Sequence, residues 1–395
     1  LQYDIGFGLN PQIIDLNNDS WLDIYVSNDF NGPDLAYLNN ADGTFSESRD
    51  AIFKHMSFNS MGSDVADMNN DGLLDLMTLD MNPEDYFRSK TTMAMTSVSK
   101  FESMVAGGYH HQYMHNMLQI NNGNGTFSEI SNMAGMANTD WSWALLSADF
   151  DLDGFNDLFV TNGVYRDVIN RDKNSEILKI LRQNKRKPTK EDFLKFTKML
   201  PQQKLKNYFF KNRGNYTFEN TSATWVDQKA TFSNGAIYAD LDNDGDLDVV
   251  VSNINDIATV FMNNSMNISE NRYLKVEFKG PVNNTNGLGA TIKLNFQNGK
   301  QQVRQLVNTR GFLSSVSNTL HFGLGDNSDI KELLVYWPDG KFQELLNVKI
   351  NQLLKLDYAL AVEKDEVVSK EQAIFVQVKS DYTHIDPYFN DYDLQ

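Results

Sequence analysis

Aspartate recurs at every second position in the stretch DLDNDGDLDVVVSN, which begins at Asp240. Asp240, Asp242 and Asp244 alternate across a short loop. Gly245 permits the positive φ of a tight turn, and Asp248 begins the apolar run that follows. Oxygen ligands at positions 1, 3, 5 and 9, with a backbone carbonyl at position 7, are a donor set that suits Ca²⁺. The spacing therefore predicts a calcium-binding loop.

Three earlier segments repeat this pattern: DLNNDSWLDIYVSND from Asp15, DMNNDGLLDLMTLDM from Asp67 and DFDLDGFNDLFVTNG from Asp149. We number the four loops 1 to 4 in chain order. A single loop of this kind could be a solvated Asp/Asn turn without metal, but four in register favour a metal-binding role. Without a cation, each loop would hold like charges close together, which destabilises a fold. We therefore predict up to four structural Ca²⁺ ions that order the loops.

The loops resemble the first half of an EF-hand but differ from it in two ways. The last acidic ligand falls at position 9 instead of 12, and a strand follows where an EF-hand has a helix. Loop 1 departs furthest from the pattern, because Ser20 stands at the glycine position, where a left-handed conformation costs about 1 kcal/mol. Asn17 and Asn69 replace a charged ligand with a neutral one. Loops 1 and 2 should therefore bind Ca²⁺ less tightly than loops 3 and 4.

Short strands must position these loops. Asn/Asp-Gly steps between apolar runs indicate hairpins after the first three loops, in YLNNADGTFSE (37–47), LQINNGNGTFSE (118–129) and YFFKNRGNYTFEN (208–220). Residues 81–115 and 164–207 lack strand alternation and are predicted to be helical insertions. Insertions of this kind in repeat proteins commonly build the partner-binding surface.

The character of the sequence changes near Asn271. Short alternating strands separated by Gly, Asn and Asp turns predict a compact β domain that ends near Leu360. The tail that follows is polar, aromatic and acidic, and we expect it to pack against another segment or to begin a further domain. The predicted organisation is a repeat segment over 1–268, a β domain over 269–360 and a tail over 361–395.

Bulk composition excludes several classes of protein. The chain has 395 residues, a formal net charge of −17 and no cysteine. An acidic surface repels phosphate backbones, so nucleic acid is not expected as a partner. The lack of cysteine excludes disulfides, thiolate metal sites and cysteine nucleophiles. No apolar run reaches the length of a transmembrane helix, so no transmembrane segment is expected in this chain.

The four loops, each followed by a strand, resemble FG-GAP/VCBS repeats, the blades of integrin-α-type β-propellers. Residues 271–358, with NGLGATIKL, TRGFLSSVSNTLHFGLGD and ELLVYWPDGK, resemble the ASPIC/UnbV domain of cartilage acidic protein and of many bacterial surface proteins. The resemblance implies an all-β fold: propeller blades with helical insertions, followed by a small β-sandwich-like domain. Propellers of this family usually close with about seven blades, so we expect that N-terminal sequence is missing, and the C-terminus is expected to be truncated too.

The calcium ligands of the family carry over position by position. The sets are Asp15, Asn17, Asp19 and Asp23; Asp67, Asn69, Asp71 and Asp75; Asp149, Asp151, Asp153 and Asp157; and Asp240, Asp242, Asp244 and Asp248. The position-7 carbonyls would come from Trp21, Leu73, Phe155 and Asp246.

The resemblance is strongest to large surface proteins of the Bacteroidota. It implies a location outside the cell at the outer-membrane surface, with a lipid anchor on the missing N-terminus. It also implies, as partners, proteins or glycans at the cell surface, including TonB-linked transport complexes.

Candidate catalytic groups are few. His110, His111 and His115 lack a zincin glutamate and an obvious third ligand, so a packed or hydrogen-bonded loop is favoured over a transition-metal site. Trp141 and Trp143 could stack on a sugar ring, but their alternation before a strand is more typical of blade core. No catalytic residue or organic cofactor is predicted.

The sequence thus favours a non-enzymatic, calcium-binding surface protein that recognises a protein or a glycan, as an accessory component of an outer-membrane assembly. Two alternatives stay open. One is an extracellular enzyme that processes polysaccharides or peptides, with its site among the insertions. The other is a purely structural subunit of an outer-membrane complex.

Overall fold

The computed structural model describes residues 6–30, 32–92, 97–184, 186–326 and 329–363. Residues 6–363 fall in one compact unit. Most of the tail predicted over 361–395 therefore lies outside the described residues. The fold is mostly β, which confirms the predicted fold class.

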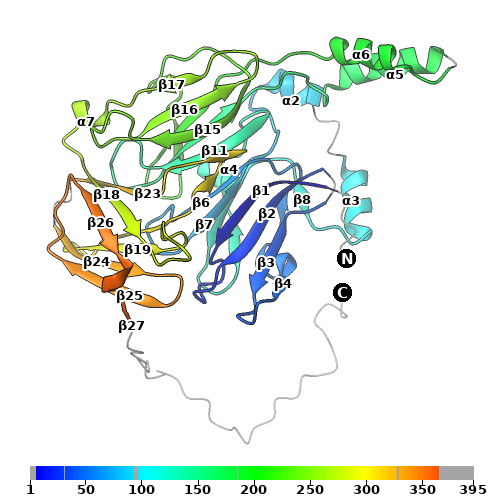
Figure 1. Cartoon of the computed structure of the whole chain (residues 1–395). Coiled ribbons are helices and arrows are strands. Elements are labelled where there is room, and N and C mark those ends of the chain that lie inside the picture. The colour runs from blue at the N-terminus through cyan, green and yellow to red at the C-terminus, as the bar shows by residue number, and fades with distance from the viewer. Residues whose placement is uncertain (1–5, 31, 93–96, 185, 327–328, 364–395) are drawn as a thin grey trace, which may run out of the picture. The chain divides into compact units, whose positions relative to one another are not determined.

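Four small antiparallel sheets, which we call blades 1 to 4, make up the repeat segment (Figure 1). Blade 1 contains β1 (Phe7–Ile14), β2 (Asp23–Asp29), β3 (Leu35–Asn39) and β4 (Phe45–Glu47). Blade 2 contains β6 (Ser63–Ala66), β7 (Asp75–Thr78), β9 (Met117–Asn121) and β10 (Phe127–Glu129). Blade 3 contains β11 (Ser142–Ala148), β12 (Asp157–Asn162), β13 (Tyr208–Asn212) and β14 (Phe218–Asn220). Blade 4 has three strands, β15 (Ser233–Ala239), β16 (Asp248–Asn253) and β17 (Thr259–Phe261).

The connections within a blade follow the sequence pattern. Each aspartate loop joins the first two strands of its blade, and each predicted hairpin joins the third strand to the fourth. Successive blades touch through their first strands, β1, β6, β11 and β15. Apolar side chains from facing blades form three successive cores, between blades 1 and 2, 2 and 3, and 3 and 4. Because each strand alternates between two faces, one face of a blade can pack on the blade before it and the other on the blade after it.

Helices occupy the two predicted insertions and several short connections. α2 (Tyr86–Thr92) and α3 (Val98–Ala106) lie within 81–115, and α5 (Arg171–Gln183) and α6 (Lys190–Met199) lie within 164–207. Thr189 and Asp192 form a capping box that fixes the start of α6, and in Figure 1 α5 and α6 extend away from the sheets. No helix among the described residues is long and apolar enough to cross a membrane. The short elements are α1 (Arg49–Ile52), α4 (Ser131–Ala134), α7 (Ser265–Ile268), and the parallel pair β5 (Met56–Ser57) and β8 (Gln112–Tyr113).

The C-terminal β domain has two sheets around one apolar core. One sheet contains β18 (Arg272–Lys279), β23 (Thr319–Gly325) and β26 (Leu353–Asp357). The other contains β19 (Thr291–Phe296), β20 (Gln301–Gln305), β24 (Ile330–Tyr336), β25 (Lys341–Leu346) and β27 (Val362–Glu363). A single 3-10 turn, η2 (Tyr358–Leu360), precedes β27.

A hairpin of this domain reaches the first strands of the blades. It consists of β21 (Thr309–Arg310) and β22 (Ser314–Ser315), and we call it the 309–315 hairpin. Its Gly311 forms a bridge with Ser63 of β6, and its Ser314 accepts a hydrogen bond from the Ala236 amide of β15 at 3.1 Å. The Phe312 ring lies 5.0 Å from that of Trp143 on β11. The β domain is therefore packed into the blade array.

Candidate calcium-binding loops

The first aspartate of each loop organises the turn. In loop 3 the Asp149 carboxylate accepts the Asp153 amide at 3.0 Å and the Gly154 amide at 2.8 Å. Asp15 and Asp67 accept the equivalent amides in loops 1 and 2, and Asp240 accepts that of Gly245 in loop 4. These bonds curl each loop around its own carboxylates.

The curl requires left-handed backbone at two positions. Position 6 has a positive φ in every loop: 73° at Ser20, 95° at Gly72, 100° at Gly154 and 109° at Gly245. Position 4 is also left-handed, with asparagine in three loops and Leu152 in loop 3. Ser20 therefore adopts the conformation that was expected to be costly for it, and Leu152 carries a strain that sequence analysis did not foresee.

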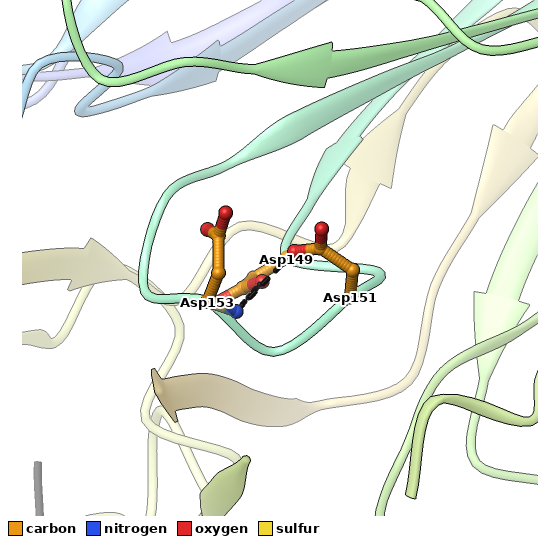
Figure 2. Close-up of side chains that lie close together, drawn as sticks. All are labelled: Asp149, Asp151 and Asp153. Carbon is orange, nitrogen blue, oxygen red and sulfur yellow. Dashed lines mark hydrogen bonds between the residues drawn. The ribbon is translucent and has the colours of Figure 1, made fainter. Parts of the chain in front are cut away.

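Carboxylates of positions 1, 3 and 5 meet in loops 3 and 4. Oxygens of Asp149, Asp151 and Asp153 all lie within 4.8 Å of one another, as do those of Asp240, Asp242 and Asp244. Figure 2 shows the three loop 3 side chains on a single turn of chain. In loops 1 and 2, position 3 offers the amide oxygens of Asn17 and Asn69, which accept the amides of Asp19 and Asp71.

The position-9 aspartates serve the backbone. Both carboxylate oxygens of Asp157 accept amides, from Phe150 at 3.0 Å and from Asn212 at 2.9 Å. Asp23, Asp75 and Asp248 make the same pair of bonds in their own loops. These residues lie outside the two three-carboxylate clusters, so their role as ligands stays a prediction. The position-7 carbonyls also stay predicted ligands. They belong to residues whose own backbone N–H groups donate to the position-5 carboxylates: Trp21, Leu73, Phe155 and Asp246.

Lysine side chains approach the two clusters. Lys211 of β13 contacts Asp151 and lies 2.8 Å from Oδ2 of Asp153. In loop 4, Lys275 of the C-terminal β domain pairs with Asp240. Part of the clustered negative charge is therefore compensated by the chain itself.

Burial raises the pKa of several loop carboxyls. It raises the pKa of Asp23 and of Asp67 to about 6, and that of Asp75 to about 8. In loop 3, burial and the neighbouring carboxylates together raise the pKa of Asp149 and Asp151. Such groups are stabilised by a bound proton or by a cation.

The donor set of loops 3 and 4 fits Ca²⁺. All side chains at positions 1, 3 and 5 present hard carboxylate oxygens, which Ca²⁺ prefers. In loop 4 the Oδ1 atom of Asp240 is buried and has no hydrogen-bond partner. A buried carboxylate oxygen without a donor is costly unless it binds a cation. Asp240, Asp242 and Asp244 would therefore hold the ion in loop 4, and Asp149, Asp151 and Asp153 the ion in loop 3.

Each blade has an asparagine that fixes its own loop, and in blades 2 to 4 this residue also links to the preceding loop, a role that the sequence pattern did not reveal. The residues are Asn39, Asn121, Asn212 and Asn263, and each backbone amide donates to the position-9 aspartate of its own blade. The Asn212 side chain also donates to the Asn156 carbonyl of its own loop and to the Met68 carbonyl of loop 2. Asn121 and Asn263 reach back to loops 1 and 3 in the same way. The signal in the sequence is an asparagine at the end of the third strand, or two residues after it in blade 4.

The C-terminal β domain covers loops 3 and 4. The Gly325 amide donates to the Leu152 carbonyl at 2.7 Å, and Asn271 donates to the Asp151 carbonyl at 2.9 Å. The His321 ring lies 2.8 Å from the Gly245 carbonyl oxygen, and burial lowers the pKa of this histidine to about 4. These two loops are therefore held between the blades and the β domain.

The histidine and tryptophan candidates have other contacts. His110 Nδ1 lies 3.0 Å from an Asp50 oxygen, and His115 Nδ1 lies 2.7 Å from the Asn116 carbonyl oxygen. Among the described residues, the three-ligand clusters are those of loops 3 and 4, so the histidines form none. Trp141 packs in the core between blades 2 and 3, and the Trp143 Nε1–H donates to the Gly163 carbonyl at 2.7 Å. The tryptophans therefore lie within the blade packing.

A cavity lies beside the helical insertions, where the enzyme alternative would need its site. It measures about 410 Å³ and is lined in part by Glu84, Arg88 and Asp140. Arg88 pairs with Asp140 and lies 2.9 Å from Asp167. One guanidinium group therefore holds both aspartates.

Comparison with known proteins finds one family model that matches within the repeat segment and another that matches within the C-terminal β domain. The family described as FG-GAP-like repeat matches residues 15–78, 104–160 and 200–251, and the family described as ASPIC and UnbV matches residues 280–363. No curated protein matches the chain significantly. One similar solved structure concerns specific recognition of non-reducing terminal N-acetylglucosamine by an Agrocybe aegerita protein; it is 14% identical, with 86% of this chain and 80% of that chain covered. Its TM-score of 0.30 is too low to support an argument about fold or ligand.

Proposed function

We propose that this FG-GAP-repeat protein, which carries an ASPIC and UnbV domain behind its repeats, binds Ca²⁺ in its aspartate loops and acts outside the cell as a recognition protein. Repeats of this type suggest a protein-interaction or adhesion-type extracellular role. The observation that carries the proposal is the convergence of three carboxylates in each of loops 3 and 4.

The role of Ca²⁺ would be structural. The ion supplies positive charge to carboxylates that the fold crowds together. Loops 3 and 4 touch both the blades and the C-terminal β domain, so an ordered loop also fixes the contact between these two parts. A rigid blade array then presents its insertions to a partner, because binding segments are commonly carried on loops positioned by a rigid scaffold.

The helical insertions are the surface we propose for partner recognition. α2 exposes Tyr86 and Phe87, at 76% and 74% of their full area, and α6 exposes Phe193 and Leu194. Exposed aromatic and aliphatic side chains on projecting helices are typical of protein-binding surfaces. We therefore propose a protein or a glycan as the partner, within an outer-membrane assembly that the family resemblance supports.

Calorimetric titration of the chelator-treated chain with Ca²⁺ tests the metal-binding part. We expect saturable binding at two or more sites and a higher Tm with Ca²⁺, while Mg²⁺ at the same concentration should have a smaller effect. Asp244→Asn should remove one site, and Asp326→Asn, outside the loops, should remove none. An unchanged Tm and no heat of binding would contradict the proposal.

Co-purification from native membranes tests the recognition part. The chain and a Phe87→Glu/Phe193→Glu variant should be compared, since both changes lie on exposed helix faces and should leave the Tm unchanged. A partner captured by the parent chain and lost from the variant is expected. Equal capture by both would exclude the insertions as the binding surface.

A further inference from the structure

Blade 4 differs from the other blades at its outer edge. Blades 1 to 3 end in β4, β10 and β14, but among the described residues β17 pairs with β16 alone. The four-residue helix α7 follows where the other blades have their fourth strand. An edge strand with free backbone donors and acceptors is a template for another strand. Figure 1 shows β17 at the free side of its sheet.

The repeated geometry shows what belongs at this edge. The paired residues in blades 1, 2 and 3 are Asn39 with Phe45, Asn121 with Phe127, and Asn212 with Phe218. Asn263 is the blade 4 equivalent of these asparagines, because its amide donates to Asp248 at 2.7 Å as theirs donate to the position-9 aspartates. The position opposite Asn263 therefore corresponds to that of a phenylalanine.

The outer-strand phenylalanine fills the core between two blades. Phe127 of blade 2 is buried in the core that blades 1 and 2 share, with its ring 5.0 Å from that of Phe53. Phe218 of blade 3 is buried in the core between blades 2 and 3. Each of these side chains thus packs on the preceding blade.

A cavity takes the corresponding place between blades 3 and 4. It measures about 570 Å³ and is lined in part by Phe150, Phe209, Trp225, Val249 and Phe261. Trp225 follows the outer strand of blade 3 as Phe53 follows that of blade 1. The aromatic lining of the cavity matches the surroundings of Phe127. The volume of the cavity is within the range of ligand pockets, about 300–1,000 Å³. The groove at β17 is also open, since Val260 and Met262 are 50% and 49% exposed.

We propose that blade 4 binds an extended segment of a partner protein, which pairs with β17 as a fourth strand and places a phenylalanine or similar aromatic side chain in this cavity. The inference rests on the proposed recognition function and names one of its binding sites. Main-chain hydrogen bonds would supply affinity, and the cavity would supply selectivity for the aromatic residue.

A segment of this chain can serve as a peptide probe for the site. A synthetic peptide of residues 124–130, NGTFSEI, carries the β10 strand and its phenylalanine. We expect it to bind the full chain with one-to-one stoichiometry in calorimetry and to change the fluorescence of Trp225. The same peptide with Phe127→Ala should bind at least tenfold more weakly, because it cannot fill the cavity. Val260→Glu in the protein should weaken binding similarly, and the matched control Val282→Glu, at a residue that is 99% exposed, should not.

Three results would overturn the proposal. Equal binding of both peptides would show that the cavity does not select an aromatic residue. Binding of the peptide only after Phe375→Ala would assign the groove to the chain's own tail. A dimer that Val260→Glu dissociates would assign it to a second copy. Calcium titration of the same samples is unaffected by these outcomes, so failure here is distinct from failure of the proposed function.

Discussion

Arg310 of the 309–315 hairpin donates through Nη1 to Oδ1 of Asp64 in β6, and both side chains are buried. The guanidinium group also donates to the Val65 carbonyl at 3.2 Å. The second carboxylate oxygen of Asp64 accepts the Ser147 amide of β11 at 2.7 Å. The pair thus joins blade 2, blade 3 and the C-terminal β domain at one point.

Removal of either partner should leave a buried charge without compensation. We expect Asp64→Ala to lower the free energy of unfolding by about 3–5 kcal/mol. The double variant Asp64→Leu/Arg310→Met should lose less than either single change, since it buries no unpaired charge. Urea denaturation checks both values. Lys204→Ala, which breaks the exposed pair with Asp256, is the control and should cost less than about 1 kcal/mol.

Asn212→Ala should destabilise two blades at once. The change removes the donors of two buried carbonyl groups, Met68 in loop 2 and Asn156 in loop 3. A cost of about 2 kcal/mol is expected, because buried acceptors would be left unpaired. Hydrogen exchange should speed up in both loops, and in neither for Asn283→Ala on the exposed loop after β18. Faster exchange in loop 3 alone would show that the hydrogen bond from Asn212 to Met68 does not stabilise loop 2.

Lys211 should compete with Ca²⁺ for loop 3. Its ammonium group lies against Asp151 and Asp153, and a cation must displace it to reach these oxygens. Lys211→Met should therefore raise the calcium affinity of loop 3, by about tenfold or 1.4 kcal/mol, and lower the Tm of the calcium-free chain. Calorimetric titration measures the first effect and a melting curve the second. Lys204→Met should change neither, and a weaker affinity in Lys211→Met would mean that the lysine assists binding.

Glu129 should stabilise the fold in a pH-dependent way. Burial raises the pKa of Glu129, but hydrogen bonds from His55 and Ser131 outweigh this effect and hold the pKa at about 2, below its usual 4.5. A carboxyl group whose pKa is lower in the folded chain than in the unfolded chain stabilises the fold at pH values above its unfolded-state pKa. This stabilisation is lost as the pH falls through its folded-state pKa. Glu129→Gln should therefore cost about 2 kcal/mol from pH 5 to pH 8, with the difference shrinking between pH 4.5 and pH 2.

Urea denaturation at a series of pH values checks this profile. Glu47→Gln is the control, because Glu47 takes the same place on β4 but is exposed. A cost for Glu129→Gln that does not change below pH 4.5 would show that the carboxylate charge is not the cause.

Local patterns predicted the repeats well. The aspartate spacing located all four loops, and the Asn/Asp-Gly steps located three hairpins, since both depend on residues close in sequence. Contacts between distant segments were not predictable in this way. Gly311 and Ser63, or Asn212 and Met68, meet because blades stack, and no short pattern encodes that stacking. At position 9 the spacing indicates a ligand, and the two amide hydrogen bonds that Asp157 accepts add a role within the blade that the spacing did not indicate.

The asparagine bridges also couple the completion of one loop to the folding of the next blade. Loop 1 gains its last side-chain donor from Asn121 and loop 2 from Asn212, each of which lies at least one blade further along the chain. During synthesis, loops 1 to 3 would complete these bonds only after the following blade has formed. The blade that emerges last would therefore be the least constrained part of a growing chain.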